Sequence, residues 1–274
     1  MATPIDYRQF IHPQDRAALD ALEKVPFFDT VLAAFMKLYD EKVEHAINMA
    51  SKLRLGPEIR PDIYNMLVDI CGKLGIEVPE LYLTQDPNPN AWTFGETKPY
   101  ITVTSGLVAI ASPREIYATL AHECGHIICH HVLYTQVAIK LIELGTSFFG
   151  VIAKFAQPLI WAFQYWRRKS ELSADRVEVY CLEETDTFIR ESMRFCGFGS
   201  GDHTAEEIAA FMKQAEDYES MLDDSFYQKA LQAFYIKDMT HPFMTVRCRE
   251  VVRWFEENKG NLPESADAPK KLQW

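Results

Sequence analysis

The feature that most constrains this chain is a histidine-rich helix pattern, SPREIYATLAHECGHIICHH, at residues 112–131. Its beginning is well marked, because Ser112 is a good N-cap and Pro113 suits the first helical position. Glu115, three residues after the serine, completes a capping box. The stretch therefore predicts a helix that begins next to Ser112 and carries four of the chain's eight histidines.

Two of these histidines are spaced to hold a single metal ion. His122 and His126 lie four residues apart, about one helical turn, so their rings project from the same face. Glu123 follows the first of them and would point beside the metal, where it can hold a water molecule. This HExxH arrangement indicates a zinc site. Two surface histidines one turn apart are the plainer alternative, but a chance match would rarely fall within a capped amphipathic helix.

The next two histidines are not expected to be ligands. On a straight helix His130 lies a further turn along the same face, about 6 Å beyond His126, and we expect it to be buried or to support a ligand. We expect His131 to face solvent or the end of the helix. A longer HExxHxxGxxH site is excluded, because Cys129 and Val132 replace its glycine and its last histidine.

A third ligand must come from further along the chain. The stretch RRKSELSADRVEVYCLE is a second helix pattern, and it offers Glu171 with Asp175 one turn later. A carboxylate there can complete a catalytic site of two histidines and one glutamate. Asp175, on the same face, is placed to accept a hydrogen bond from the far nitrogen of a liganding imidazole, with His122 the first choice. Carboxylate pairs with this spacing are common on solvated helices. We assign this pair to the metal site only because the two histidines of the first helix need a third ligand.

The order of patterns along the chain predicts an α+β fold that is mainly helical. Residues 1–76 form an N-terminal helical region, and residues 77–258 form the catalytic region, with both in one compact unit. Three short runs, VPELYLTQ, NAWTFG and YITVTSGL, predict a small antiparallel sheet next to the histidine helix, with residues 91–95 as one strand. Residues 259–274 are expected to be a flexible tail.

Composition narrows the range of partners. The net charge of −11 argues against nucleic acid, because binding to phosphates needs a basic face. The beginning, MATPIDYRQFIHPQDR, lacks the pattern of a secretory signal, and the six cysteines include no CxxC pair. We therefore expect a cytoplasmic protein, peripheral to a membrane at most.

An apolar stretch at residues 132–166 qualifies this expectation. Charged residues interrupt it, and no uncharged run reaches the roughly 18 to 20 residues that span a bilayer. The favoured interpretation is a buried helical hairpin, broken near Gly145 or Gly150 and again at Pro158. Contact with a membrane surface, or an interface between copies of the chain, remains the alternative.

The motifs together resemble a known family. NPNAWTFGETKPYITVTSGL, AHECGH, SELSADR and THPFMTVR occur in the order found in zinc metallopeptidases of the HtpX, Oma and CAAX prenyl endopeptidase type, within the gluzincins. The resemblance extends over residues 12–254. It implies that zinc is bound by His122, His126 and Glu171, with Glu123 as general base and acid. It also implies that a strand containing Asn90, Ala91, Trp92 and Thr93 lies along the substrate backbone.

Two residues near the C-terminus enter only through this resemblance. In the family pattern His241 and Arg247 border the active site, and His241 could donate to the oxyanion of the tetrahedral intermediate. A histidine there could instead occupy the fourth position on the metal, or residues 261–274 could lie in the groove as a pseudo-substrate. The chain lacks the membrane spans of the embedded relatives and is closer to soluble or peripheral members.

These observations predict a zinc metalloendopeptidase with one Zn²⁺ per chain. It would cleave extended or unfolded polypeptide through attack by a zinc-bound water, assisted by Glu123. One alternative is a catalytically silent zinc-binding chaperone or adaptor that holds extended polypeptides, but such a module has no need for Glu123. The other is a zinc hydrolase for non-peptide bonds, which the groove-forming strand makes less attractive.

Overall fold

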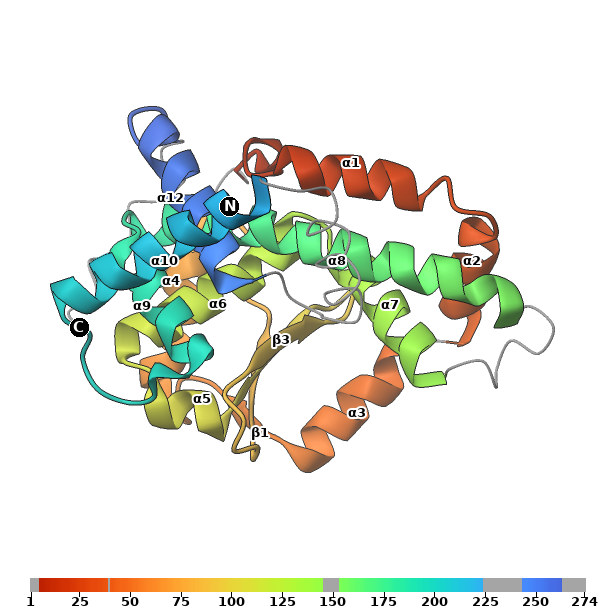
Figure 1. The fold of residues 1–274 in the computed structure, drawn as a ribbon. Coiled ribbons are helices and arrows are strands. Elements are labelled where there is room, and N and C mark those ends of the chain that lie inside the picture. The colour runs from red at the N-terminus through yellow and green to blue at the C-terminus, as the bar shows by residue number, and fades with distance from the viewer. Residues whose placement is uncertain (1–4, 39, 145–152, 224–242, 263–274) are drawn as a thin grey trace.

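The computed structural model describes residues 5–38, 40–144, 153–223 and 243–262, and in it helices enclose a small sheet (Figure 1). The first half contains the elements η1 (Tyr7–Gln9), α1 (Pro13–Leu22), α2 (Phe28–Leu38), α3 (Glu41–Ser51), β1 (Leu53–Leu55), α4 (Pro61–Leu74), β2 (Glu80–Thr84), β3 (Ala91–Phe94), β4 (Tyr100–Thr104) and α5 (Ser105–Ile110). The second half contains α6 (Pro113–Ile128), α7 (Val132–Leu144), α8 (Ala153–Leu182), α9 (Asp186–Met193), the π-helical turn η4 (Arg194–Phe198), α10 (Ala205–Asp223) and α12 (Met244–Asn258). The α+β, mainly helical prediction is confirmed.

The four-stranded sheet has the order β1-β2-β4-β3 and is mixed rather than antiparallel. Strand β3 pairs antiparallel with β4 as expected, with Ala91 opposite Val103, but β2 and β4 run parallel. After β2 the chain first forms the edge strand β3 and then reverses direction to form β4 between β2 and β3. Strand β4 therefore runs parallel to β2. Strand β4 lies between β2 and β3, and all five of its residues are buried. Strand β1, in a region where only helices were expected, adds an antiparallel edge to β2.

Helices α6 and α8 form the centre of the molecule (Figure 1). The predicted start of α6 is confirmed: Ser112 and Glu115 form the reciprocal capping box, and Pro113 opens the helix. The two helices approach closely at Gly125, where an added Cβ would lie 2.9 Å from the Cα of Ala174. This contact brings the histidine face of α6 against the carboxylate face of α8.

Apolar side chains gather in two clusters. The larger lies between the sheet, α4, α6 and the C-terminal part of α8. The smaller joins α1 and α2 to α7 and the start of α8, and it includes Leu22, Phe28, Val137 and Trp166. The described residues of the apolar stretch 132–166 thus contribute to a core.

Two statements about this stretch follow from the structure. Helix α8 continues through Pro158, so the predicted break at that proline is wrong. Pro158 is the sixth residue of α8, so it removes the one hydrogen bond that an N–H there would donate to residue 154, while the buried side chains of Leu159 and Phe163 hold this part of the helix in the smaller cluster. Among the described residues, no helix is both long and apolar enough to cross a membrane.

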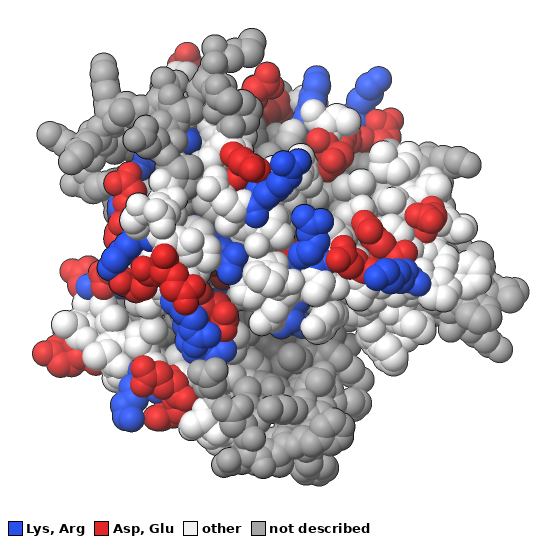
Figure 2. Space-filling model, turned by 90° about the horizontal axis from the view of Figure 1, so that it is seen from above, with Lys and Arg blue, Asp and Glu red and all other residues white. Residues whose placement is uncertain are grey.

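Charged side chains are mixed on the face shown in Figure 2. Lys and Arg lie among Asp and Glu there, and uncharged surface separates them. On this face the described basic residues form no continuous stripe of the kind that tracks a phosphate backbone.

Candidate metal centre and active site

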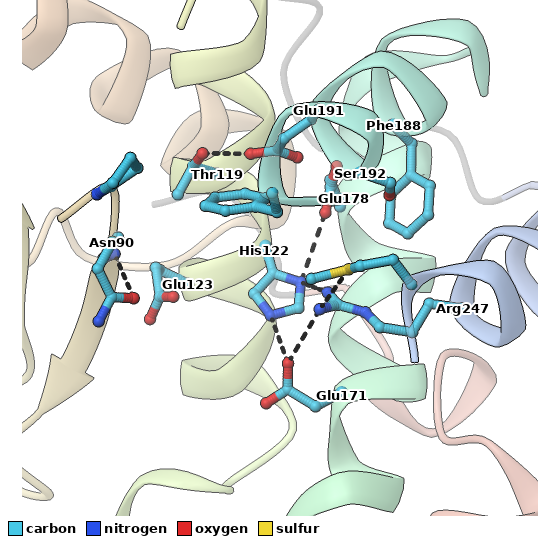
Figure 3. Close-up of a pocket in the computed structure, with 14 residues that line it drawn as sticks. Asn90, Thr119, His122, Glu123, Glu171, Glu178, Phe188, Glu191, Ser192 and Arg247 are labelled. Atoms are coloured by element: carbon cyan, nitrogen blue, oxygen red, sulfur yellow. Dashed lines mark hydrogen bonds and ion pairs between the residues drawn. The ribbon is translucent and has the colours of Figure 1, made fainter. Parts of the chain in front are cut away.

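The side chains of His122 and His126 on α6 and of Glu171 on α8 converge on one point. Figure 3 shows two of them, His122 and Glu171. Nε2 of His122 lies 3.4 Å from Oε2 of Glu171, and Nε2 of His126 lies 3.5 Å from Oε1 of the same carboxylate. Donor atoms about 2.1 Å from a tetrahedral zinc ion are roughly 3.4 Å apart. Two imidazole nitrogens and one carboxylate at this spacing fit Zn²⁺ in both chemistry and size.

Glu123 is held beside these donors by the edge strand. The Thr93 hydroxyl donates a 2.5 Å hydrogen bond to Oε2 of Glu123, and both side chains are buried. From the sequence, Thr93 was expected only in a strand that lies along the substrate backbone. Its hydrogen bond to Glu123 was not predicted. It fixes one carboxylate oxygen and leaves the other to act on a bound molecule.

The far nitrogen of His122 meets a buried cluster of charges. Its Nδ1 lies 3.1 Å from Oδ1 of Asp175, as the sequence predicted, and 3.4 Å from Nη2 of Arg247. Arg247 donates to both oxygens of Asp175 and lies 3.5 Å from Oε2 of Glu171. Burial is the largest single influence and opposes ionisation of Asp175, but the charges and hydrogen bonds of Arg247 and His122 together outweigh it and lower the pKa of Asp175 below its usual value.

A second trio of donors shares His122 with the first. His122, Asp175 and Glu178 have ligand atoms within 4.8 Å of one another. The guanidinium of Arg247 already provides a cation at Asp175, in contact with the same imidazole nitrogen. Arg247 therefore already supplies a positive charge to two members of this trio, Asp175 and His122.

The far nitrogen of His126 has a partner that corrects two predictions. Its Nδ1 lies 3.0 Å from Nδ1 of His131, whose Nε2 lies 3.0 Å from Oδ2 of Asp15 on α1. His131 is buried instead of facing solvent, and His130 is exposed instead of buried. Helix α6 ends at Ile128 and His130 adopts φ of 59°, so the straight-helix geometry no longer applies.

A pocket of about 360 Å³ opens from the donors (Figure 3). Asn90 and Ala91 line one side, and Thr119, Glu178 and Glu191 lie at the other end. The sequence predicted no role for Glu178 or Glu191, because each is one of many charged residues within a helix pattern. Burial, and next the charge of Glu178, raise the pKa of Glu191, while burial also raises the pKa of Glu178.

The remaining predicted residues divide into two groups. Asn90, Ala91, Trp92 and Thr93 lie in or next to β3, at the edge of the sheet and beside α6. His241 and residues 263–274 lie outside the described residues.

Comparisons with known proteins agree with this geometry. The sequence profile of "Peptidase family M48" matches residues 61–255. A plastoglobule-localized metallopeptidase 48, chloroplastic, from Arabidopsis thaliana is 26% identical over 258 residues, which are 91% of this chain and 73% of that protein. Protease HtpX homologs are also similar. The one from Pelotomaculum thermopropionicum is 30% identical over 46% of this chain, and the one from Persephonella marina is 28% identical over 50%.

The matched regions differ in extent. The chain spans 43% and 45% of the lengths of the two HtpX homologs, so the match there is confined to part of each protein. The family profile, by contrast, includes the sheet strands β2, β3 and β4 together with α6, α8 and α12, which carry the donors, Glu123 and Arg247. The chain therefore belongs to peptidase family M48 and is a metallopeptidase.

Proposed function

We propose that the chain is a zinc metalloendopeptidase that cleaves extended or unfolded polypeptide segments, with one Zn²⁺ held by His122, His126 and Glu171. The observation that carries the proposal is the spacing of the three donors, 3.4 and 3.5 Å between nitrogen and oxygen, with Glu123 beside them. Three protein ligands leave a further position for water or substrate.

Zinc in this position would supply a Lewis acid that polarises the scissile carbonyl and lowers the pKa of a bound water. Glu123 would take the proton from the attacking water and return it to the leaving amine. Thr93 donates to Oε2, which keeps the carboxylate oriented and leaves Oε1 for proton transfer. By family resemblance, His241 would donate a hydrogen bond to the oxyanion. Two alternatives are second choices: His241 occupies the fourth position on the metal, or residues 261–274 lie in the substrate groove.

The edge of β3 supports binding of the substrate as a further strand. The carbonyl of Asn90 accepts from N–H of Thr104, and in an antiparallel ladder the next residue, Ala91, then points its backbone groups away from β4. The N–H of Ala91 now meets the side-chain oxygen of Asn90 at 2.9 Å. A substrate carbonyl would replace that oxygen, so backbone contacts would give affinity with little dependence on sequence.

For its location, we propose that the chain works in the cytoplasm and that the described residues of the stretch 132–166 serve its smaller core. Peripheral contact with a membrane is the alternative. It would use Trp161 and Tyr165, which are about half exposed on α8, since such aromatic side chains favour the membrane interface. A relative whose name places it at plastoglobules keeps this alternative in view.

The test is cleavage of casein by the purified protein before chelation, after chelation, and after zinc is returned. We expect cleavage that chelation abolishes and zinc restores. A p-nitrophenyl ester series, measured in parallel, covers a hydrolase for non-peptide bonds. Chelator-sensitive ester hydrolysis without casein cleavage would favour that rival. Suppressed aggregation of unfolded casein without cleavage would favour the chaperone-like module.

A further inference from the structure

The active-site pocket extends past the metal donors to a pair of buried carboxyl groups (Figure 3). Glu178 comes from α8 and Glu191 from α9, and they are 1% and 6% exposed. Oε2 of Glu178 lies 3.4 Å from Nδ1 of His122, and Glu191 accepts a hydrogen bond from the hydroxyl of Thr119. The proposed chemistry uses neither carboxyl group.

Among the described residues these two carboxyl groups form no ion pair with a lysine or an arginine, and the one basic side chain that Glu178 meets is the imidazole of His122, at 3.4 Å. Arg247 is the one lysine or arginine among the described residues that line the pocket, and its hydrogen bonds to carboxylate go to Asp175, with Glu171 also nearby. Oε1 of Glu178 is buried without a hydrogen-bond partner among the described residues. A buried carboxylate without a full set of partners is costly, so the site favours a ligand that brings a positive charge.

The walls above the carboxyl groups are apolar. Phe188 and Met244 line the pocket, and Phe195 lies at its exposed side. Lysine and arginine side chains combine an apolar stem with a charged end, and they match a pocket that is apolar along its sides and acidic at its end. A neutral or acidic side chain would leave the carboxyl groups without a cation or add a like charge.

The depth of the pocket also fits such a side chain. Thr119, which holds Glu191, precedes His122 on α6 by three residues, or roughly 4.5 Å along the helix axis. A lysine stem of four carbons carries its ammonium group roughly 6 Å from the backbone. A peptide bond held at the metal donors would therefore place the end of an adjacent basic side chain beside the two carboxyl groups.

We propose that this pocket binds the side chain of a lysine or arginine that flanks the scissile bond, with its cationic end between Glu178 and Glu191. The inference rests on the proposed peptidase function and names the preference that function would have. The backbone contacts at β3 supply affinity, and this pocket supplies selectivity.

The experiment begins with a peptide mixture of balanced composition, cleaved by the zinc-loaded protein and read by mass spectrometry. We expect lysine and arginine to be enriched at one of the two positions that flank the cleaved bond. Two matched peptides then differ only there, one with lysine and one with norleucine, which keeps the stem and removes the charge. A charged hydrogen bond of this kind predicts kcat/KM about ten- to a hundredfold higher for lysine.

Isosteric variants connect the preference to the carboxyl groups. Glu191→Gln, and separately Glu178→Gln, should reduce the lysine-to-norleucine ratio to within about threefold, since the amide removes one charge and keeps the shape. Glu206→Gln removes an exposed carboxylate from α10 and should keep the full ratio. Zinc content measured in each variant separates a loss of selectivity from a loss of metal, which matters because Glu178 contacts His122.

The outcomes separate this inference from the function beneath it. Efficient cleavage with no enrichment of basic residues would overturn the pocket assignment and leave the peptidase proposal standing. An unchanged lysine preference in both variants would also overturn it. If no peptide is cleaved by the zinc-loaded protein, the peptidase proposal fails and this inference fails with it.

Discussion

Each side chain that would hold the metal is itself held by another side chain. The far nitrogen of His122 meets Asp175, which Arg247 neutralises. The far nitrogen of His126 meets His131, which Asp15 anchors from α1. Such outer contacts fix the ring orientation and the protonated nitrogen of a liganding histidine.

The chain from Asp15 through His131 to His126 gives a prediction at this scale. Asp15→Asn keeps the shape of the side chain but removes the charge that orients His131, so affinity for zinc should fall about ten- to a hundredfold. A competition titration with a chromophoric chelator measures it. Asp20→Asn, on the exposed side of the same helix, should leave the affinity unchanged. Equal zinc affinities of the Asp15→Asn variant and the wild type would show that Asp15 does not support the metal site.

Residue spacing predicted the parts of the site that lie within one helix, and failed where the chain turns. His122, Glu123, His126 and the Glu171–Asp175 pair follow from helical periodicity. His130 and His131 exchanged their expected places because α6 ends before them and His130 takes a left-handed conformation. Asp15 is more than a hundred residues from His131 in sequence, so only the tertiary fold brings them together.

At the scale of the elements, the site depends on how closely α6 and α8 approach. Gly125 faces the backbone of Ala174, and an added Cβ would lie 2.9 Å from its Cα and 3.0 Å from its oxygen. Backbone atoms of a buried helix cannot move aside as the end of a flexible side chain can. The donors of the two helices are therefore held at their spacing by the absence of a side chain.

Gly125→Ala should push the helices apart, with loss of zinc affinity and destabilisation of about 1–3 kcal/mol, the usual cost of overpacking. Thermal unfolding and zinc content measure the two effects. Gly72→Ala is the matched control, because it lies within α4 with nothing within 4 Å of its added Cβ. It should be neutral or stabilising by up to about 1 kcal/mol. A Gly125 variant as stable and as zinc-rich as the Gly72 variant would contradict this account.

The free edge of β3 gives a second prediction for an element. Ala91→Pro removes the N–H that points away from β4 and should raise KM for peptide substrates roughly tenfold while zinc stays bound. Ala91→Val, which keeps the N–H and suits a strand, should stay close to the wild type. Unchanged KM in the proline variant would show that substrate does not pair with this edge.

Two features of the sheet could not be predicted from local sequence patterns. The three predicted strand runs correspond to β2, β3 and β4, yet the parallel pairing of β2 with β4 depends on where the chain crosses, which alternation within a run does not encode. Strand β1 has only three residues, one of them buried, and offers too little pattern to find.

For the whole molecule, helices α1 and α2 join the catalytic region through the smaller apolar cluster, and α4 joins it through the larger one. Helix α1 packs along α8, and Asp15 reaches from it to the site. That residues 1–76 and 77–258 form one compact unit stays a prediction. Helix α7 and the start of α8 complete the same cluster.

If residues 132–166 serve this core, the protein should be monodisperse without detergent and should not sediment with lipid vesicles. Size-exclusion chromatography with light scattering, followed by vesicle sedimentation at low and high salt, checks both statements. Sedimentation that persists at high salt would favour apolar contact with the membrane, because salt weakens only electrostatic docking. The double variant Trp161→Ser with Tyr165→Ser would then show whether the exposed face of α8 makes that contact.

Casein cleavage by the Glu123→Gln variant tests whether Glu123 performs proton transfer beside a zinc ion held by His122, His126 and Glu171. Glutamine has nearly the size of glutamate, and residue 123 is not one of the three proposed metal ligands. The variant should therefore fold and retain about one zinc per chain. Cleavage should fall by at least about a hundredfold, because general base and acid catalysis is removed. Retained zinc with lost cleavage is the predicted result. Cleavage near the wild-type rate in the zinc-loaded variant would contradict the account.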